Sequence, residues 1–582
     1  MRRILGLSAL AACLGSCASL PEGSAPALPS AYYRLMEIEL ATAEKRWAAQ
    51  PEADLKTLES APFGKHFPSA ILVAAVLHEI PHPANPSFGN PARLAFALRV
   101  GDLLASEHEA GRFSERLDHH RDAYMWLEAF RLLERRLDDA RRARWKKELE
   151  KSMTSLAADI ELRKGVARYQ SPFLGTSTNH FSLWASTLYL AGRVFGNPGW
   201  QDLGASVMRR IVSEQSPDGY WGEHSDAGPT TGYDYLTVTG VALYAAHSRD
   251  PEAVEALSRN TRFHLNFTWP DGVPVEVIND RNRHWPISSW GHFAFSGSPE
   301  GRRYAAFLTG FLRPGELWLE WVGRIAQNAL YFQEGPVAPI PQDLERYSYR
   351  MRVPAGIRKS GPWAACLSGL ISTSATGSQF YLDRQGHLSV WHRKVGLIIS
   401  GANSKRQPEL ATFHERSQGQ DSFMPESSVL DMKDSGDRLS LAYRSFNADL
   451  ELDPPQGDTL GLRIRIQDRN RRDEGFLTFQ LCLKPGETLE TGTRSIVLGA
   501  EAISLGPEEI GGVLRHRGWE LRVDPSARLL WPVYPFNPYA NGPETDISKA
   551  VAALSVPLNT KLDGRYRRQE IRFTLSVPER RS

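Results

Sequence analysis

The sequence predicts an α+β multidomain chain. An N-terminal α/α toroid, meaning an incomplete barrel of paired helices, precedes an antiparallel β-sandwich domain. Residues 31–333 carry apolar residues at helical spacing in one run after another. Residues 351–582 carry short alternating runs between turns. A proline-rich stretch within residues 334–350 is expected to link the two parts. At 582 residues the chain exceeds one hydrophobic core, which also favours separate domains.

Paired helices account for the first part. Asn197-Pro198 and residues 248–251 supply signals that end one helix and begin the next. No strand pattern lies between the helices and no fixed repeat period indicates a solenoid, so an inner ring of helices wrapped by an outer ring is favoured. The eleven expected helices span residues 32–49, 70–79, 91–109, 121–137, 139–158, 181–195, 199–214, 234–246, 251–265, 302–311 and 316–332.

Short strands account for the second part. Turn dipeptides such as Gly386-His387, Pro485-Gly486 and Asp563-Gly564 lie between the alternating runs, as in an antiparallel β-sandwich or stacked sheets. The expected strands span residues 379–382, 388–392, 396–400, 439–443, 461–466, 476–483, 494–498, 519–523 and 571–577.

Composition excludes some classes of protein. Hydrophobic residues make up 41% and charged residues 23%, as in soluble globular proteins. With 69 basic and 67 acidic residues the chain is not a globally basic nucleic-acid binder, and no nucleic-acid partner is expected. No Cys or His cluster has zinc-site spacing, so neither a metal nor a cofactor is expected. The chain is expected to act as a monomer.

The first 30 residues have the pattern of an export signal and a tether. Arg2 and Arg3 precede an apolar run over residues 4–12, and Leu14-Gly15-Ser16-Cys17 resembles the lipobox of bacterial lipoproteins. Cys17 is therefore the expected lipidated residue; Leu10-Ala11-Ala12-Cys13 fits the same pattern but leaves a very short signal. Residues 1–17 are read as the signal peptide and residues 18–30 as a flexible tether. A plain secretory signal without lipid is the alternative.

The expected location follows from this segment. The apolar run is too short to span a bilayer, and no later run of about 20 apolar residues exists. The sequence thus predicts an exported protein of the outer membrane, periplasm or cell surface, in contact with a membrane only through its lipid. Only Cys366 and Cys482 follow the signal; in an oxidising compartment they could pair, and the sequence leaves that open.

Residues 178–244 gather the side chains that could carry chemistry. Asn179 and His180 open one apolar helix, and Tyr233 and Tyr235 open another. Glu223 and His224 lie in the loop that leads into the second of these helices, among aromatic residues that include Trp221. Helix starts and connecting loops are where a rigid framework usually presents functional groups.

This set of residue types suits the cleavage of a uronic-acid-containing polysaccharide by β-elimination. The carboxylate must first be neutralised by hydrogen-bond donors such as Asn, Arg or His, because only then is the proton on C5 acidic enough to remove. A base must take that proton and an acid must protonate the leaving glycosidic oxygen, which His and Tyr can do. Arg281, Arg283 and His284, in a loop with Trp285, supply the missing cations.

Each residue also has an ordinary structural explanation. Asn179 could cap its helix, because asparagine is a favoured cap. His224 alone is typical of a surface loop, Tyr233 and Tyr235 alone are typical of packing, and the 281–284 run alone is typical of a solvated surface. Their joint occurrence on successive loops of one toroid favours the functional interpretation.

The same residues resemble two groups of toroid polysaccharide lyases. Asn179-His180 opening an apolar helix, then Glu214-Gln215 and Asp218-Gly219 leading to Glu223, is similar to the heparinase II/III-like and alginate-lyase group. His224 followed by Thr230-Thr231-Gly232-Tyr233 is similar to the hyaluronate and chondroitin AC lyase group. Both groups place a toroid before β-sheet domains.

The resemblance implies roles for the residues that match. Asn179 with Arg283 or Arg281 neutralises the uronate carboxylate, Tyr233 delivers a proton to the leaving oxygen, and either His224 or His180 takes the C5 proton. A histidine of the sheet domain, His392 or His414, could also enter the site. The residues expected to contact substrate are Glu223, Tyr235, Arg281 and His284, with Trp221, Trp285 and Trp290 as stacking platforms.

Two other functions fit parts of the sequence. A glycoside hydrolase on the same toroid needs two carboxylates beside the scissile bond, and Asp218, Glu223, Asp226 and Asp234 are available. A non-catalytic glycan-binding lipoprotein needs only the aromatic side chains on which sugar rings stack. The sequence leaves the identity of the uronate polysaccharide and endo or exo action open.

Overall fold

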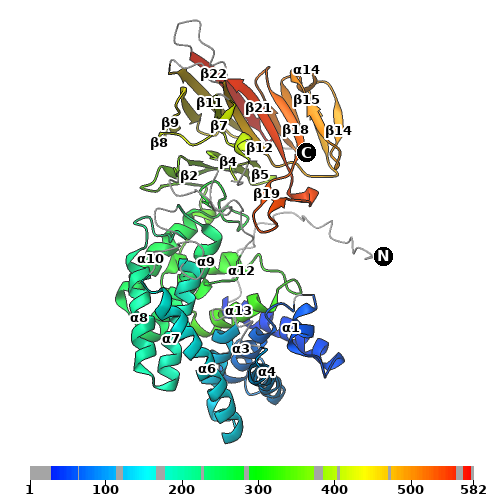
Figure 1. The fold of residues 1–582 in the computed structure, drawn as a ribbon. Helices are drawn as coiled ribbons and strands as arrows, with labels where there is room; N and C mark the ends of the chain where they lie inside the picture. The colour runs from blue at the N-terminus through cyan, green and yellow to red at the C-terminus, as the bar shows by residue number, and fades with distance from the viewer. Residues whose placement is uncertain are drawn as a thin grey trace.

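A computed structural model describes residues 28–62, 64–112, 122–165, 177–223, 228–280, 288–371, 385–402, 407–417, 419–469, 474–558 and 568–578. A helical domain comes first and a domain of antiparallel sheets lies above it in the view of Figure 1. The predicted fold class, a toroid followed by an antiparallel β-sandwich, is confirmed. The expected strand over residues 379–382 lies outside the described residues.

The helical domain is built from consecutive helices joined by connections of very different lengths, the longest lying before α9 and between α10 and α11. Two short elements, α2 and α11, were not predicted, and α5 begins at Tyr124, three residues later than expected. The helices are α1 (Leu28–Ala49), α2 (Leu55–Ser60), α3 (Ala70–Glu79), α4 (Pro91–Glu109), α5 (Tyr124–Leu133), α6 (Asp139–Arg163), α7 (Thr178–Phe195), α8 (Pro198–Ser213), α9 (Thr231–Ser248), α10 (Pro251–Asn266), α11 (His292–Phe295), α12 (Pro299–Thr309) and α13 (Leu319–Tyr331).

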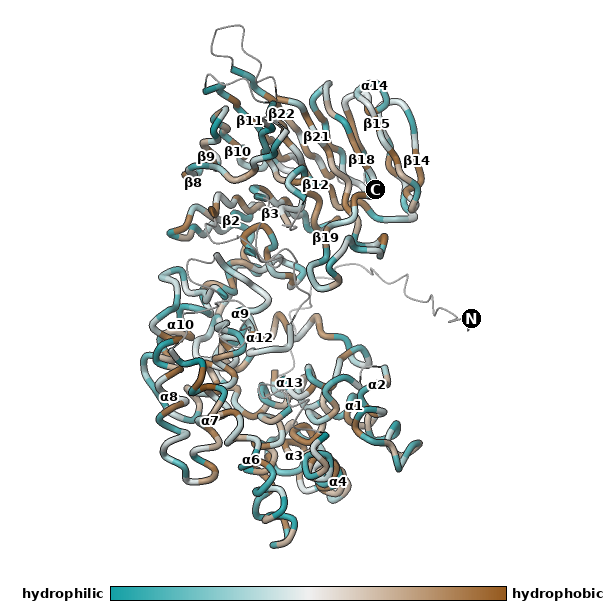
Figure 2. Tube along the Cα trace, viewed as in Figure 1, coloured by the Kyte–Doolittle hydropathy of each residue, from teal (hydrophilic) through white to brown (hydrophobic). Residues whose placement is uncertain are grey.

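Burial separates inner from outer helices. Every residue of α3 from Ala70 to His78 is buried, and α7 and α9 are buried on nearly all sides. By contrast, α6 buries one stripe and presents charged residues elsewhere, as Figure 2 shows along its far end. Because inner and outer helices alternate along the chain, α7 and α9 run in the same direction and their N-termini lie at the same end of the toroid.

A close approach fixes α7 against α9. A side-chain carbon added at Gly240 of α9 would lie 2.6 Å from the Ser182 carbonyl carbon of α7. Any larger residue at position 240 would therefore push the two helices apart. The helix starts at Thr178 and Thr231 are held side by side by this contact.

The sheet domain holds two large antiparallel sheets. Their orders are β1-β2-β3-β4-β5-β12-β21-β18-β15, with β6 and β7 attached to β12, and β14-β13-β16-β17-β22-β11-β10-β9-β8. The strands of the first sheet are β1 (Arg346–Arg350), β2 (Ala355–Ser360), β3 (Trp363–Ser368), β4 (Leu388–His392), β5 (Gly396–Ser400), β6 (Phe413–Ser417), β7 (Gln420–Ser422), β12 (Glu474–Leu481), β15 (Ile503–Leu505), β18 (Arg528–Val533) and β21 (Val551–Leu558).

The second sheet completes the sandwich. Strand β11 alternates buried Leu462, Ile464 and Ile466 with partly exposed Arg463 and Arg465, so one face packs on the first sheet and the other meets solvent. Its strands are β8 (Ser427–Lys433), β9 (Gly436–Ala442), β10 (Phe446–Leu452), β11 (Thr459–Asp468), β13 (Thr488–Thr491), β14 (Ser495–Val497), β16 (Val513–His516), β17 (Trp519–Arg522) and β22 (Arg568–Ser576); the short helix α14 (Pro507–Ile510) connects β15 to β16. A separate hairpin pairs β19 (Phe536–Asn537) with β20 (Gly542–Pro543).

A shared core joins the two domains. Tyr220, Phe263 and Trp269 of the helical domain pack in one buried cluster with Ile357 and Trp391 of the sheets. Buried polar contacts reinforce it. The Ser389 hydroxyl donates to the Glu276 carboxylate at 2.6 Å, and the Trp391 indole donates to the Asp271 carboxylate at 2.9 Å. These contacts fix how the sheets sit on the toroid.

Asp218 is one of the residues that join the domains. Its carboxylate oxygens accept hydrogen bonds from the backbone N–H groups of Arg352 at 2.7 Å and Val353 at 3.2 Å. The turn that contains Asp218 needs Gly219, which has a φ of 94° and lies against the Arg259 carbonyl.

We expect Asp218→Ala to lower the free energy of unfolding by about 1–2 kcal/mol, because two part-buried N–H groups lose a charged acceptor. Chemical denaturation followed by tryptophan fluorescence measures this. Asp202→Ala, which removes an exposed carboxylate from neighbouring α8, is the matched control and should change little. Equal stabilities for the two variants would contradict the role given to Asp218.

The two cysteines are free and lie too far apart to pair. Cys366 is on β3 and Cys482 directly follows β12, with β4 and β5 between these strands. Three strand spacings amount to about 14 Å, whereas bridged Cα atoms lie within about 7 Å. Burial raises the pKa of both thiols, that of Cys482 to about 12, so they are inert core residues.

The predicted linker overlaps regular structure. Helix α13 ends at Tyr331 and β1 already begins at Arg346. The expected signal peptide and most of the expected tether, including Cys17, lie outside the described residues. Within the described ranges, no helix is long and apolar enough to cross a membrane.

Candidate active site

The first turn of α7 presents Asn179 in a fixed orientation. Ser177 is the N-cap, so Asn179 does not cap the helix by itself. Its side-chain oxygen accepts hydrogen bonds from the Ser177 hydroxyl at 2.5 Å and the His180 backbone N–H at 2.8 Å. Its amide nitrogen donates to Glu223 at 3.1 Å. Because a primary amide has two N–H groups, one donor is left over after this contact.

The loop before α9 holds the amide from the other side. Glu223 is only 2% exposed, and Thr178 donates from its hydroxyl to the Gly222 carbonyl at 2.9 Å. The Glu223 carboxylate therefore orients Asn179, which is itself 1% exposed, and the contact of Glu223 with substrate stays a prediction. Gln215 anchors the same loop by donating to the Gly219 and Ala256 carbonyls.

Glu223→Ala should lower kcat by roughly tenfold, because Asn179 loses the acceptor that orients its donor group. Glu223→Gln keeps an acceptor oxygen and should stay close to wild type. Steady-state kinetics on a uronic-acid-containing polysaccharide that the wild-type protein cleaves measures both effects. Equal losses in the two variants would show that the negative charge, and not the orientation, is what matters.

The first turn of α9 presents Tyr233. This side chain is half-buried, and its hydroxyl lies 2.8 Å from the hydroxyl of Tyr539. The next residue, Asp234, is fully buried and locks the helix start. Its carboxylate accepts from the Trp221 backbone N–H at 3.0 Å and the Asn260 amide at 2.6 Å, and lies 3.0 Å from the His264 ring.

Tyr235 points into the core. It is 1% exposed, its hydroxyl is 2.7 Å from that of Tyr304, and its ring packs on His264 at 4.2 Å between centroids. Burial raises its pKa to about 12. The prediction that Tyr235 contacts substrate is wrong. The side chain of Tyr235 faces the interior of the toroid, where its hydroxyl contacts Tyr304.

Two of the three predicted tryptophan platforms are core residues. Trp221 is fully buried and its indole donates to the Ile211 carbonyl at 2.8 Å. Trp290 is buried and its ring is covered by the Arg324 guanidinium at 3.8 Å. Neither ring is open to a sugar, so the stacking prediction is wrong for both. Trp285 lies outside the described residues.

Four predicted polar residues also lie outside the described residues, namely His224, Arg281, Arg283 and His284. The last described residue before that loop is informative. The Asp280 backbone N–H donates to the Pro229 carbonyl at 2.7 Å, and its carboxylate accepts from the Gly228 N–H at 3.2 Å. Asp280 thus lies beside the loop that leads into Tyr233.

His180 is the described histidine of the candidate set. It is half-buried in the first turn of α7, directly after Asn179. The helix N-terminus places a partial positive charge beside it, which favours a bound anion.

The sheet-domain histidines have structural roles. His392 lies on β4 with its ring packed on Trp363 at 4.5 Å, and His414 on β6 stacks on Phe476 at 4.6 Å. Burial lowers the pKa of each to about 4. The sheet domain contributes a tyrosine to the candidate site instead.

Tyr539 was not among the predicted residues. It lies in the turn of the β19–β20 hairpin, 306 residues from Tyr233. The local sequence Pro535-Phe536-Asn537-Pro538-Tyr539 does carry one signal, an aromatic residue in a proline- and asparagine-rich turn. Nothing in that signal indicates which distant residue it meets.

The carboxylates considered for hydrolysis are engaged elsewhere. Asp218 joins the domains, Asp234 locks the start of α9, and Glu223 holds Asn179. Asp226 lies outside the described residues. The three described carboxylates of this set therefore have structural partners. The described part of the chain holds no group of three or more His, Cys, Asp or Glu placed to bind a metal ion.

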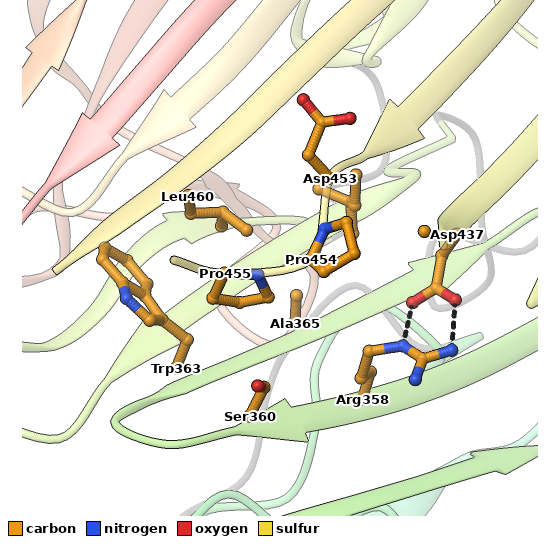
Figure 3. Close-up of a pocket in the computed structure, with 11 residues that line it drawn as sticks. Arg358, Ser360, Trp363, Ala365, Asp437, Asp453, Pro454, Pro455 and Leu460 are labelled. Atoms are coloured by element: carbon orange, nitrogen blue, oxygen red, sulfur yellow. Dashed lines mark hydrogen bonds and ion pairs between the residues drawn. The ribbon is translucent and has the colours of Figure 1, made fainter. Parts of the chain in front are cut away.

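A hollow in the sheet domain is separate from these residues. Figure 3 shows it between the two sheets, with Arg358 paired to Asp437 and Pro454 beside Pro455. Its cavity volume is about 20 Å³, and it is lined by Arg358, Ser360, Trp363, Ala365, Gly436, Asp437, Leu452, Asp453, Pro454, Pro455 and Leu460. None of the candidate catalytic residues borders it.

The candidate site therefore lies where the start of α7, the start of α9 and a hairpin of the sheet domain come together. Asn179 and the helix N-termini can neutralise an anion, and Tyr233 can exchange a proton. Asn179 and Tyr233 are tied to one loop, Asn179 through Glu223 and the start of α9 through Trp221.

Comparison with known proteins agrees with this architecture. No protein-family model and no curated protein matches the sequence. Among solved structures, a heparinase III aligns over 89% of this chain and 78% of its own, with a TM-score of 0.50 at 12% identity. The heparan sulfate lyase HepC of Pedobacter heparinus aligns over 93% of this chain and 88% of its own, with a TM-score of 0.47 at 12% identity. A mutant of that lyase gives 0.49 at 10% identity over 88% and 76%. The chain shares with heparinase III the fold of an α/α toroid followed by antiparallel sheets.

Proposed function

We propose that this protein is a polysaccharide lyase that cleaves a uronic-acid-containing polysaccharide by β-elimination. The observation that carries the proposal is the pairing of two helix starts. Asn179, oriented by Glu223, and Tyr233, whose helix start is locked by Asp234, lie at the same end of the toroid against the sheet domain. The fold shared with heparinase III supports the same reaction class.

In the proposed reaction the uronate carboxylate binds at the N-terminus of α7. The donor of Asn179, with Arg283 or Arg281, neutralises its charge and makes the C5 proton acidic. His180 or His224 takes that proton, and Tyr233 protonates the leaving glycosidic oxygen. Where base and acid lie on the same side of the sugar, Tyr233 can perform both steps.

Hydrolysis on the same toroid is a weaker proposal. It needs a carboxylic acid and a second carboxylate flanking the scissile bond. Asp218, Glu223 and Asp234 are buried and hydrogen-bonded to other parts of the protein, so they support structural roles. Glycan binding without catalysis would leave the fixed orientation of Asn179 without a chemical purpose.

A screen of uronate polysaccharides tests the proposal. Alginate, glucuronan, ulvan, hyaluronan and heparan-like chains are each incubated with the protein, and the absorbance of the product's C4–C5 double bond is followed. We expect at least one polymer to give rising absorbance with wild type and none with Tyr233→Phe. Shorter chains without the absorbance would indicate hydrolysis, and binding without shortening would indicate a glycan-binding protein.

The location of the protein is proposed from the sequence alone. Arg2, Arg3, the apolar run and Cys17 support an exported lipoprotein of the outer membrane, periplasm or cell surface. An extracellular or periplasmic position would bring the protein to polymers too large to enter a cell.

A further inference from the structure

The sheet domain delivers a second phenol to the candidate site. The Tyr539 hydroxyl lies 2.8 Å from the Tyr233 hydroxyl, although the Tyr539 side chain is 43% exposed. An exposed tyrosine gains little stability from a hydrogen bond to another exposed group, since water offers the same bond. The two domains are already joined by a buried core, so this contact is not needed to dock them.

The hairpin is built to hold this phenol in place. The Asn537 side-chain oxygen accepts from the Tyr539 backbone N–H at 3.0 Å, and its amide nitrogen donates to Glu544 at 2.9 Å. Gln407 fixes the base of the hairpin by donating to the Tyr534 carbonyl and accepting from the Phe536 N–H, both at 2.9 Å. The backbone of Tyr539 is thereby tied to the hairpin and to the segment at Gln407 before its side chain reaches Tyr233.

We propose that Tyr539 is a positioning residue of the lyase reaction: its hydroxyl donates a hydrogen bond to the Tyr233 oxygen as that oxygen gives its proton to the leaving sugar. This inference rests on the proposed function. The inference gives the β19–β20 hairpin a catalytic role. Neither the exposure of Tyr539 nor its distance along the sequence from Tyr233 suggests that role.

The bond changes define what Tyr539 does. The C5–H bond breaks and the proton goes to a histidine ring nitrogen. The electron pair of that bond forms the C4–C5 double bond. The C4–O4 bond breaks, and its electron pair stays on O4. O4 takes the proton of Tyr233, which is left as a phenolate. The histidine later returns its proton to Tyr233 through solvent, and the enzyme is restored.

A phenolate is a stronger acceptor than a phenol, so the bond from Tyr539 strengthens as the proton leaves. The partial positive charge at the N-terminus of α9 acts on the same oxygen. An interaction that is stronger in the transition state than in the ground state raises kcat and leaves substrate binding nearly unchanged.

The test removes one hydroxyl and keeps the ring. Tyr539→Phe should lower kcat about 10- to 100-fold on the polymer found by the screen, the loss typical of a hydrogen bond to a charged group. KM should stay within about twofold, because the bond contributes little before the proton moves. Tyr534→Phe is the matched control in the same segment, since Tyr534 contacts Gln407 through its backbone carbonyl, and it should retain wild-type kcat.

A second substrate separates a chemical role from a structural one. In a short uronate oligosaccharide whose scissile O4 carries a 4-nitrophenyl group, the leaving nitrophenolate needs no proton. The loss in Tyr539→Phe should shrink to within about twofold on this probe, because the step that Tyr539 assists is no longer required. A hairpin that had simply been displaced would impair both substrates equally.

The outcomes separate this inference from the proposed function. If wild type cleaves a polymer and Tyr539→Phe matches it in kcat, the inference is overturned and the lyase assignment stands. An equal loss of activity on the polymer and the nitrophenyl probe also overturns it. If wild type yields no unsaturated product from any polymer, the proposed function fails and the role of Tyr539 fails with it.

Discussion

Tyr233→Phe should abolish cleavage while leaving binding of the polysaccharide nearly unchanged. The variant keeps the aromatic ring and its place in the first turn of α9 but loses the proton that the leaving oxygen needs. Loss of a general acid costs about 10²- to 10⁴-fold in rate, and the larger figure applies if Tyr233 also serves as the base. Product absorbance measures turnover, and calorimetric titration with the polymer measures affinity.

Tyr235→Phe is the control for this variant. It lies two residues along the same helix, and its buried hydroxyl contacts Tyr304 in the core. We expect a lower melting temperature with kcat close to wild type. Normal activity in Tyr233→Phe would remove Tyr233 from the mechanism. Loss of activity in Tyr235→Phe with an intact fold would show that the loss in Tyr233→Phe is not specific to its hydroxyl.

Asn179→Ala should lower kcat by about 10²- to 10³-fold, the loss typical of removing a donor that stabilises a developing oxyanion. Asn179→Asp gives the sharper result. An aspartate keeps the oxygen that accepts from Ser177 and from the His180 N–H, but it lacks N–H donors and carries a charge that repels the uronate. Its activity should be as low as that of Asn179→Ala, and its loss of stability should be larger, because the new carboxylate faces the buried Glu223 carboxylate to which the amide donates at 3.1 Å.

The N-cap residue of another helix supplies the comparison for Asn179. Asn197 caps α8 by accepting from the Trp200 N–H at 3.2 Å, with no link to the candidate site. Asn197→Ala should cost about 1 kcal/mol of stability and leave kcat unchanged. A loss of activity in Asn179→Ala no greater than in Asn197→Ala would show that Asn179 serves the helix alone.

The fold could be predicted because its signals are local. Helical spacing and punctuation such as Asn197-Pro198 identify helices one at a time, and the alternation in residues 461–466 identifies a strand with one buried face. The cluster at the starts of α7 and α9 could also be predicted, because Asn179, His180 and Tyr233 occupy first turns that the sequence marks.

The direction of individual side chains could not be predicted. Tyr233 and Tyr235 are equivalent in the sequence, yet about 100° of helix rotation per residue turns one toward the sheet domain and the other into the core. Trp221 and Trp290 were candidate platforms because indoles suit sugars, and they are buried because large apolar rings also fill cores. The Tyr233–Tyr539 contact spans 306 residues and depends on how two domains dock.

The chemistry of the product tests the lyase assignment most directly. Wild-type protein is incubated with the cleaved polymer in water labelled with heavy oxygen, and the fragments are analysed by mass spectrometry and ultraviolet absorbance. β-Elimination predicts fragments that carry a C4–C5 double bond and no label, because water is not added across the broken bond. Fragments that carry the label and lack the double bond would contradict the assignment and identify a hydrolase.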